Sequence, residues 1–162
     1  MEDNQIKSNE PTISAPPGLD VSKVKAPKKD TRIQTEDVTH TKGLNFADFN
    51  LSHDVQLGLY ELGYERPSPI QEECIPVALE GKNIIARAKN GTGKTGAYAI
   101  PLVEKVDATK DTIQALVLVP TRELAMQTRN FIYDLGKHKK IQVMVTTGGN
   151  PVKEDIYRLY KT

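Results

Sequence analysis

The sequence predicts an α/β domain in which helices flank a parallel sheet. Segments with helical spacing of apolar residues alternate with short apolar segments, and this alternation is typical of parallel sheets. The segment Ile113 to Val119 is almost continuously apolar, as expected for a strand covered on both faces. A glycine-rich loop at residues 88–95 joins an apolar segment to a helical one. The length of 162 residues favours one domain with tails.

Helices are expected wherever apolar periodicity is bounded by capping residues. Apolar residues recur at helical spacing between Leu51 and Leu62, with Ser52 as N-cap and Gly63 as the stop. Further helices are expected over Pro69–Leu79, Lys94–Lys105, Arg122–Gly136 and Val152–Leu159. Pro76 should kink or shorten the first of these. Short strands are expected at residues 83–88, 113–119 and 141–146.

Residues 1–43 are predicted to form a disordered tail. They contain no aromatic residue, and prolines and charges of both signs interrupt any periodic pattern. Such a segment buries too little apolar surface to offset its chain entropy. It also carries a lysine cluster, at Lys23, Lys25, Lys28 and Lys29. A solvated linker is preferred for this cluster over a contact with RNA or a partner.

The composition excludes a strongly basic nucleic-acid binder and a membrane-spanning chain. The formal net charge is +1, so any RNA contact must be local. The longest aliphatic run, Ala115 to Val119, is too short for a bilayer, and the first residues lack the regions of a signal peptide. With Cys74 as the single cysteine, a reducing compartment is expected, and core packing is favoured over a nucleophilic role.

A phosphate-binding loop is the strongest signal in the sequence. The loop is Ala88-Lys89-Asn90-Gly91-Thr92-Gly93-Lys94-Thr95, with Ala in place of the usual first glycine. The glycines allow successive N–H groups to point inward, and the following helix N-terminus adds positive potential. Lys94 is predicted to reach the β and γ phosphates of ATP, and the Thr95 hydroxyl to bind Mg²⁺. Lys94 and Thr95 are therefore the candidate catalytic residues.

The segment Gly63 to Gln71 has two interpretations. Ser68 and Gln71 stand at the N-cap and N3 positions of a helix and would form a capping box. The Gln71 amide also has the donor and acceptor needed to recognise the edge of adenine. Spacing alone favours the capping role.

Two further segments combine helix or turn signals with anion-binding chemistry. Pro120, Thr121 and Arg122 begin a helix, where Thr121 suits the N-cap. A helix N-terminus beside an arginine is also suited to a phosphate. Gly148 and Gly149 follow the third expected strand, where they permit close backbone approach or an ordinary turn.

These motifs, in this order, resemble those of DEAD-box ATP-dependent RNA helicases. Residues 63–71 resemble the family's Q motif, in which glutamine recognises adenine and an upstream aromatic residue stacks on it. The matching aromatic is Phe46, seventeen positions before Gly63, and core packing is its alternative role. The resemblance also implies an adenine contact for Arg66.

The resemblance extends the expectations to RNA and to the fold. It implies RNA-backbone contacts from Pro120, Thr121, Arg122, Gly148 and Gly149, independent of RNA sequence. The expected fold is an incomplete RecA-like P-loop domain over residues 44–162, with the Q motif at about 44–72 and the P-loop at 88–95.

The amino-acid sequence at residues 86–91 and 145–149 is most similar to the cytoplasmic branch of this family. Members of that branch repress translation and promote mRNA decapping in P-bodies. The resemblance therefore implies a cytoplasmic location in P-bodies or other RNP granules. It also implies partners among the decapping and translational-repression proteins, and no membrane association.

The sequence departs from the family because it stops at Thr162, before the Asp-Glu-Ala-Asp motif and the second RecA-like domain. Hydrolysis needs a carboxylate to hold Mg²⁺ and orient water. The chain is therefore expected to be a fragment that is inactive alone, marginally stable and prone to aggregate. Alternatives are a non-catalytic nucleotide- or partner-binding polypeptide and, ranked last, a small P-loop kinase.

Overall fold

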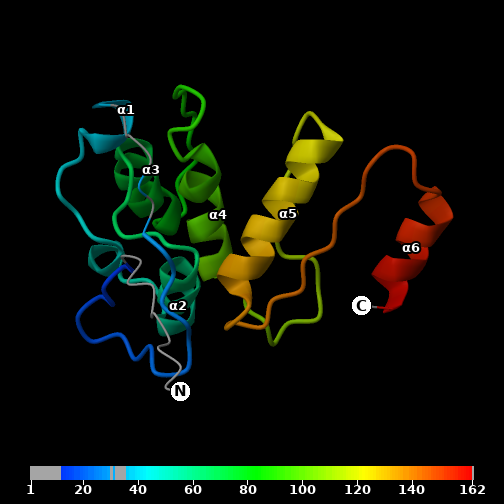
Figure 1. Ribbon diagram of the computed structural model, residues 1–162. Coiled ribbons are helices and arrows are strands. Elements are labelled where there is room, and N and C mark those ends of the chain that lie inside the picture. Colours follow the sequence, from blue (N-terminus) through cyan, green and yellow to red (C-terminus); the bar gives the residue numbers. More distant parts are fainter. Residues whose placement is uncertain (1–11, 30, 32–35, 162) are drawn as a thin grey trace, which may run out of the picture.

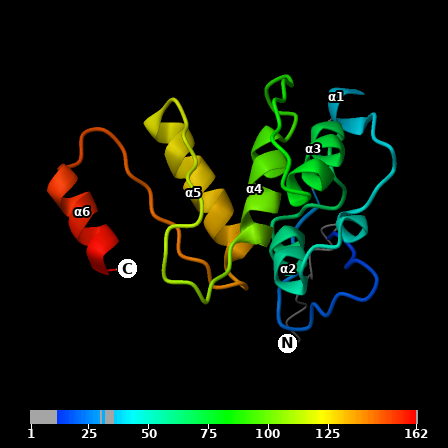
Figure 2. The same cartoon turned by 180° about the vertical axis from the view of Figure 1, so that it is seen from behind.

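The computed structural model describes residues 12–29, 31 and 36–161. Along the chain, the elements are α1 (Glu36–Thr39), the 3-10 helix η1 (Phe46–Phe49), α2 (His53–Glu61), α3 (Pro69–Leu79), α4 (Lys94–Lys105), α5 (Arg122–Gly136) and α6 (Val152–Lys161). Figures 1 and 2 show α2, α3, α4 and α5 grouped together, with α6 set apart at the C-terminal end. Among these helices, none combines the length and apolar character needed to cross a membrane.

The helices begin and end where local signals predict. Ser52 and Ser68 are the N-cap residues of α2 and α3, and the chain turns at Gly63 and Gly81 with φ of 81° and 85°. A positive φ of this kind favours glycine because other side chains clash with the backbone. Pro76 does not shorten α3, which continues to Leu79.

The predicted parallel sheet is not confirmed, because the described residues contain no strand. The segments 83–88, 113–119 and 141–146 have no ladder pairing. A strand needs a neighbour about 5 Å away to satisfy its N–H and C=O groups. Here residues 113–119 and 141–146 instead line a common cavity of about 1030 Å³. The sequence supplied strand-forming segments, but strand formation depends on pairing between distant segments.

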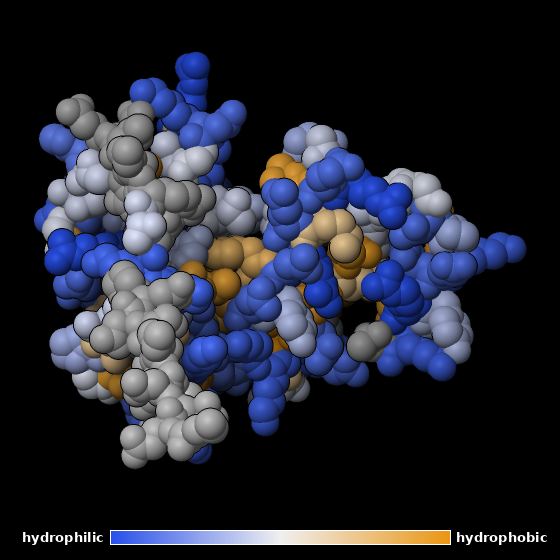
Figure 3. Space-filling model, in the orientation of Figure 1, coloured by the Kyte–Doolittle hydropathy of each residue, from blue (hydrophilic) through white to orange (hydrophobic). Residues whose placement is uncertain are grey.

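The unpaired segments expose apolar side chains. Ile85 is fully exposed, and Leu116 and Leu118 are 79% and 85% exposed. Figure 3 shows apolar surface near the centre of the face in view. Helix α6 also has no buried residue, although Ile156 and Leu159 lie on it. Exposed apolar surface of this kind favours association, and the tendency to aggregate stays a prediction.

Part of the predicted N-terminal tail makes defined contacts. Thr12 and Lys28 form an isolated antiparallel bridge, and the backbone N–H of Ile13 donates to the carbonyl of Pro27 at 3.3 Å. Ile13 is only 5% exposed. The prediction of a disordered tail over residues 1–43 did not anticipate these contacts. Residues 1–11, 30 and 32–35 of that prediction lie outside the described part of the chain.

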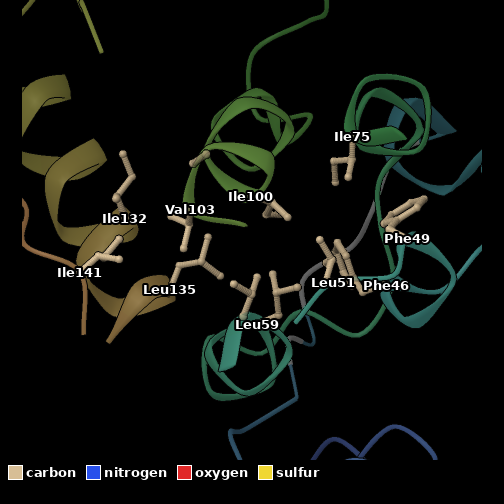
Figure 4. Packing of buried hydrophobic residues seen from close by; sticks show 12 residues of the cluster. Phe46, Phe49, Leu51, Leu59, Ile75, Ile100, Val103, Ile132, Leu135 and Ile141 are labelled. Atoms are coloured by element: carbon tan, nitrogen blue, oxygen red, sulfur yellow. The ribbon is translucent and has the colours of Figure 1, made fainter. Parts of the chain in front are cut away.

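The core lies between α2, α3, α4 and α5. Val55, Leu59, Ile100, Val103 and Leu135 are all at most 2% exposed. Figure 4 shows these helices directing aliphatic side chains toward a common centre. The core therefore comes mainly from helix packing, with Leu51 and Ile141 added from outside the helices, and it holds α3 and α4 side by side.

Cys74 on α3 is buried, as its core interpretation predicts. Burial and the charge of Glu73 both raise the pKa of the Cys74 thiol. A raised pKa leaves little of the nucleophilic thiolate at neutral pH.

Helices α2 and α5 approach closely at Gly58. A methyl group on Gly58 would collide with the backbone carbonyl of Leu135. The same helices are tied at their C-terminal ends, where Glu61 accepts a hydrogen bond from Lys137 and faces His138 Nε2 at 2.8 Å.

Burial alone would raise the pKa of the Glu61 carboxyl. The hydrogen bonds from Lys137 and His138, together with their charges, outweigh burial, so the pKa lies below its ordinary value. The folded state therefore favours the charged form of Glu61.

We expect Gly58→Ala to destabilise the fold by about 1–3 kcal/mol, since overpacking outweighs the roughly 1 kcal/mol gained in helix propensity. Urea unfolding checks this. Gly148→Ala is the matched control, because a Cβ at Gly148 meets no atom within 4 Å. Equal stability of the two variants would contradict the close approach.

We expect Glu61→Gln to lower the free energy of unfolding at pH 7 by about 1 kcal/mol. The folded pKa of Glu61 is lowered, so its contribution is present above the ordinary carboxyl value of 4.5 and is lost as the pH falls through the folded pKa. The stabilities of wild type and variant should therefore converge as the pH falls through the folded pKa of Glu61, below its ordinary value. A constant difference across this range would refute the ion pair.

Candidate functional site

The phosphate-binding loop connects an unpaired segment to the N-terminus of α4. Gly93 is the N-cap of α4 with φ of 91°, and Gly91 has φ of 79° with open space around it. Both values need glycine. The backbone therefore turns twice just before the 12-residue α4 helix, whose first N–H groups lack helical partners.

The Lys94 ammonium is engaged by carbonyl groups of its own loop. Its Nζ atom donates to the carbonyls of Ala88 at 2.6 Å and Lys89 at 2.7 Å, and lies 3.5 Å from Asn90 Oδ1. The Thr92 hydroxyl also donates to Lys89, at 2.8 Å. The loop is closed on itself, so a phosphate group must take Lys94 from these carbonyl partners.

The chemistry of the loop fits a nucleotide phosphate. The N-terminus of α4 supplies unpaired N–H groups beside the cationic Lys94 side chain, and this combination favours anions. Thr95 is half-buried in the first turn of α4, where its hydroxyl could bind Mg²⁺ with phosphate oxygens and waters. Within the described ranges, no cluster of three His, Cys, Asp or Glu residues could hold the ion instead.

Gln71 joins the predicted Q segment to the loop. Its Oε1 atom accepts the backbone N–H of Ser68 at 3.0 Å, which is the return bond of the capping box. Its Nε2 atom donates to the carbonyl of Gly93 at 3.0 Å. Gln71 is only 2% exposed. The capping role is therefore formed, and a second contact reaches the phosphate loop.

The base-recognition role of Gln71 stays a prediction. A side-chain amide has two N–H donors and two acceptor lone pairs. One of each is used in the bonds to Gly93 and Ser68. One of each remains, so capping and recognition of a base edge do not exclude each other.

Sequence reasoning missed Gly96. A methyl group on Gly96 would lie 2.5 Å from Gln71 Nε2, and one on Gly93 would lie 2.7 Å from the same atom. Two glycines, one at the N-cap of α4 and one in its first turn, therefore make room for one buried amide on α3. A glycine inside a predicted helix is a signal of close packing, but the sequence does not say against which residue.

The Ser68 hydroxyl faces the same point. It is buried and faces the Gln71 backbone N–H in the capping box, without a hydrogen bond of good geometry, and it would lie 2.9 Å from a Cβ on Gly93. A buried hydroxyl without a partner costs roughly 1–3 kcal/mol. The α3–α4 junction therefore keeps an unused polar atom beside the loop.

The other two predicted adenine contacts differ in accessibility. Arg66 is exposed three residues after Gly63. Phe46 is only 6% exposed and packs edge-on against Phe49 and Tyr64, each with ring centroids 6.1 Å away. Its core role is therefore formed, and only a small part of the residue is open to a base.

The two predicted RNA segments lie together. Thr121 accepts the backbone N–H of Leu124 at 3.2 Å and caps α5 as predicted. A Cβ built on Gly149 lies 3.8 Å from a guanidinium nitrogen of Arg122. The exposed Pro120–Arg122 turn therefore meets the Gly148–Gly149 turn, although 27 positions separate Arg122 from Gly149.

We expect Gln71→Glu to destabilise the protein by about 1–3 kcal/mol, because a carboxylate oxygen would replace the donor facing the Gly93 carbonyl. Urea unfolding without nucleotide measures this loss. Gln127→Glu, at an exposed position of α5, is the matched control. If both variants lose the same stability, the hydrogen bond from Gln71 to the Gly93 carbonyl does not stabilise the protein.

Relatives of the chain share this set of motifs. The chain is 58% identical over 156 residues to "DEAD-box ATP-dependent RNA helicase 6" of Oryza sativa subsp. japonica, covering 91% of this chain and 31% of that protein. It is 59% identical over 140 residues to "ATP-dependent RNA helicase me31b" of Drosophila melanogaster, covering 86% and 30%. The chain thus spans less than a third of the length of these relatives.

Solved structures show the same similarity. A DEAD box protein from the hyperthermophile Methanococcus jannaschii matches with a TM-score of 0.63 and 36% identity, over 71% of this chain and 32% of that one. Dbp5 of S. cerevisiae, bound to RNA and ADP BeF3, matches with a TM-score of 0.58 and 35% identity, over 60% and 25%. The helices of this chain thus follow those of RecA-like helicase domains.

The DEAD/DEAH box helicase family matches residues 68–162, more than half of the chain. This range includes the phosphate loop, Gln71 and the Arg122 and Gly149 turns. The chain belongs to the DEAD/DEAH box helicase family.

Proposed function

We propose that this chain binds Mg²⁺ and ATP as the N-terminal portion of an ATP-dependent RNA helicase. The observation that carries the proposal is the bond from Gln71 Nε2 to the Gly93 carbonyl, which joins the expected adenine side to the phosphate loop. Lys94 and the loop amides at 88–95 would hold the phosphates. The magnesium ion, held with Thr95, would neutralise phosphate charge. Phe46 and Arg66 complete the proposed adenine side.

The proposed second site is an RNA-backbone contact at the start of α5. Arg122 and the helix N-terminus offer a guanidinium and free N–H groups, and the open Gly148–Gly149 turn lets a backbone approach closely. Pro120 and Thr121 shape this turn. Contacts of this kind hold a strand without reading its sequence. The solved Dbp5 complex with RNA supports the proposal through similarity.

The proposed cellular role is mRNA turnover and translational repression in cytoplasmic P-bodies, with decapping and repression proteins as partners. It rests on the wording of residues 86–91 and 145–149 and on 59% identity with me31b. Residues 1–162 alone are proposed to bind nucleotide without turnover, since hydrolysis requires a carboxylate at the magnesium site. Family membership rules out the kinase alternative.

A second candidate function is non-catalytic binding of nucleotide or a protein partner. The exposed Ile85, Leu116 and Leu118 favour it, because apolar surface of this kind can be covered by a partner. The two proposals differ in RNA binding, which only the first assigns to the turns at Arg122 and Gly149. Titration of labelled single-stranded RNA into wild type and Arg122→Ala separates them, because only the first predicts that wild type binds and that the variant binds more weakly. An ATPase assay with RNA, with Lys94→Ala as the blank, tests the absence of turnover that both expect.

We expect Lys94→Ala to weaken Mg-ATP binding about tenfold to a hundredfold, because it removes a charge-assisted contact with the phosphates. Fluorescence titration of a labelled ATP analogue measures this. Lys82→Ala is the control, since Lys82 is exposed and pairs with Glu80. Equal affinity of both variants, or no binding by folded wild type at millimolar nucleotide, would overturn the proposed site.

A further inference from the structure

Glu72 is a buried carboxylate that neither the phosphate loop nor the RNA turns explain. It lies in the first turn of α3, directly after Gln71, and is 4% exposed. Its Oε2 atom accepts the backbone N–H of Lys42 at 2.6 Å, and its Oε1 atom accepts that of Leu44 at 3.1 Å. Both oxygens therefore hold a segment 28 to 30 positions earlier in the chain.

These two bonds fix the position of the backbone at residues 42–44, and they do not depend on the side chains at residues 42 and 44. Hydrogen bonds from N–H groups to a carboxylate are stronger than neutral ones, and two of them define an orientation. Burial excludes competing water from Glu72. Figures 1 and 2 show the chain between α1 and η1 running past α3. Glu72 therefore attaches this segment to the helix that carries Gln71.

The attachment continues to Phe46. Leu44 is held by Glu72, and the next backbone N–H, of Asn45, donates to Asp48 at 2.7 Å within the cap of η1. Phe46 is the first residue of η1. Only 6% of Phe46 is exposed, so a base can reach only a small part of the ring. A small displacement of η1 would therefore change how much of the Phe46 ring a base could contact.

Glu73 provides a contrast at the next position. Its side chain is 63% exposed and pairs with the equally exposed Lys42 ammonium. Exposed ion pairs contribute little to stability. Glu72 and Glu73 thus hold the backbone and the side chain of the same residue, one buried and one in solvent.

We propose that Glu72 is a positioning residue that holds the Phe46 side of the nucleotide site in register with Gln71 and thereby sets selectivity for adenine. The proposal rests on the nucleotide site described under the proposed function. Glu72 itself touches no nucleotide. It acts through the backbone of residues 42–44, so its loss should affect recognition of the base and leave the phosphate loop unchanged.

The test compares Mg-ATP, Mg-GTP and inorganic tripolyphosphate binding by calorimetry, for wild type, Glu72→Gln, Glu73→Gln and Lys42→Pro. Glu72→Gln places an N–H donor against a backbone N–H. Lys42→Pro removes one donor without altering α3. We expect both to reduce the ATP-to-GTP affinity ratio about tenfold. Tripolyphosphate affinity should stay unchanged, and Glu73→Gln should behave as wild type.

Retained tripolyphosphate binding reports that the loop of each variant is folded. An unchanged ATP-to-GTP ratio in Glu72→Gln would overturn the positioning role, as would a parallel loss of tripolyphosphate binding, which indicates general unfolding. A wild type that binds tripolyphosphate but does not distinguish ATP from GTP would also overturn it. If the wild type binds none of the three ligands, the proposed function itself is contradicted.

Discussion

The close packing of α3 against α4 around one amide is the constraint on which the rest of the site depends. Gln71 is buried between Ser68 and Gly93, and Gly93 and Gly96 leave just enough room for it. The Gly93 carbonyl also accepts the first helical bond of α4, from Ala97. The start of the helix and the position of Gln71 are therefore set together. A change in the conformation of the phosphate loop should therefore alter the packing of the segment that carries Gln71.

The helices could be predicted because their signals are local. Ser52, Ser68 and Thr121 occupy N-cap positions, and α3, α4 and α5 have the expected bounds. The sheet could not be predicted in the same way. A run such as Ile113 to Val119 shows strand preference, but pairing requires a neighbour supplied by another part of a chain. The exposed Leu116 and Leu118 show the consequence of missing pairs.

The site was predictable in its parts and less so in its connections. The glycine loop and the capping position of Gln71 follow from spacing. The nearness of Arg122 to Gly149 does not, because the two lie far apart in the sequence, and their assignment to RNA stays a prediction. The contacts of Glu72 were not predictable, because a glutamate in a first helical turn signals only a favourable dipole interaction. Its partners are backbone groups, which have no signature in the sequence. Similarly, the periodicity around Phe46 does not reveal how much of its ring is exposed.

Because the phosphate loop contacts the segment that carries Gln71, opening of the loop should affect both segments. Lys94 is held by the carbonyls of Ala88 and Lys89, so phosphate binding must rearrange this loop. The loop includes Gly93, whose carbonyl accepts the Gln71 amide. Hydrogen–deuterium exchange of the folded protein, with and without Mg-ATP, tests this most directly. We expect slower exchange with nucleotide at both 88–97 and 68–72. Slower exchange at the loop alone, with 68–72 unchanged, would contradict it.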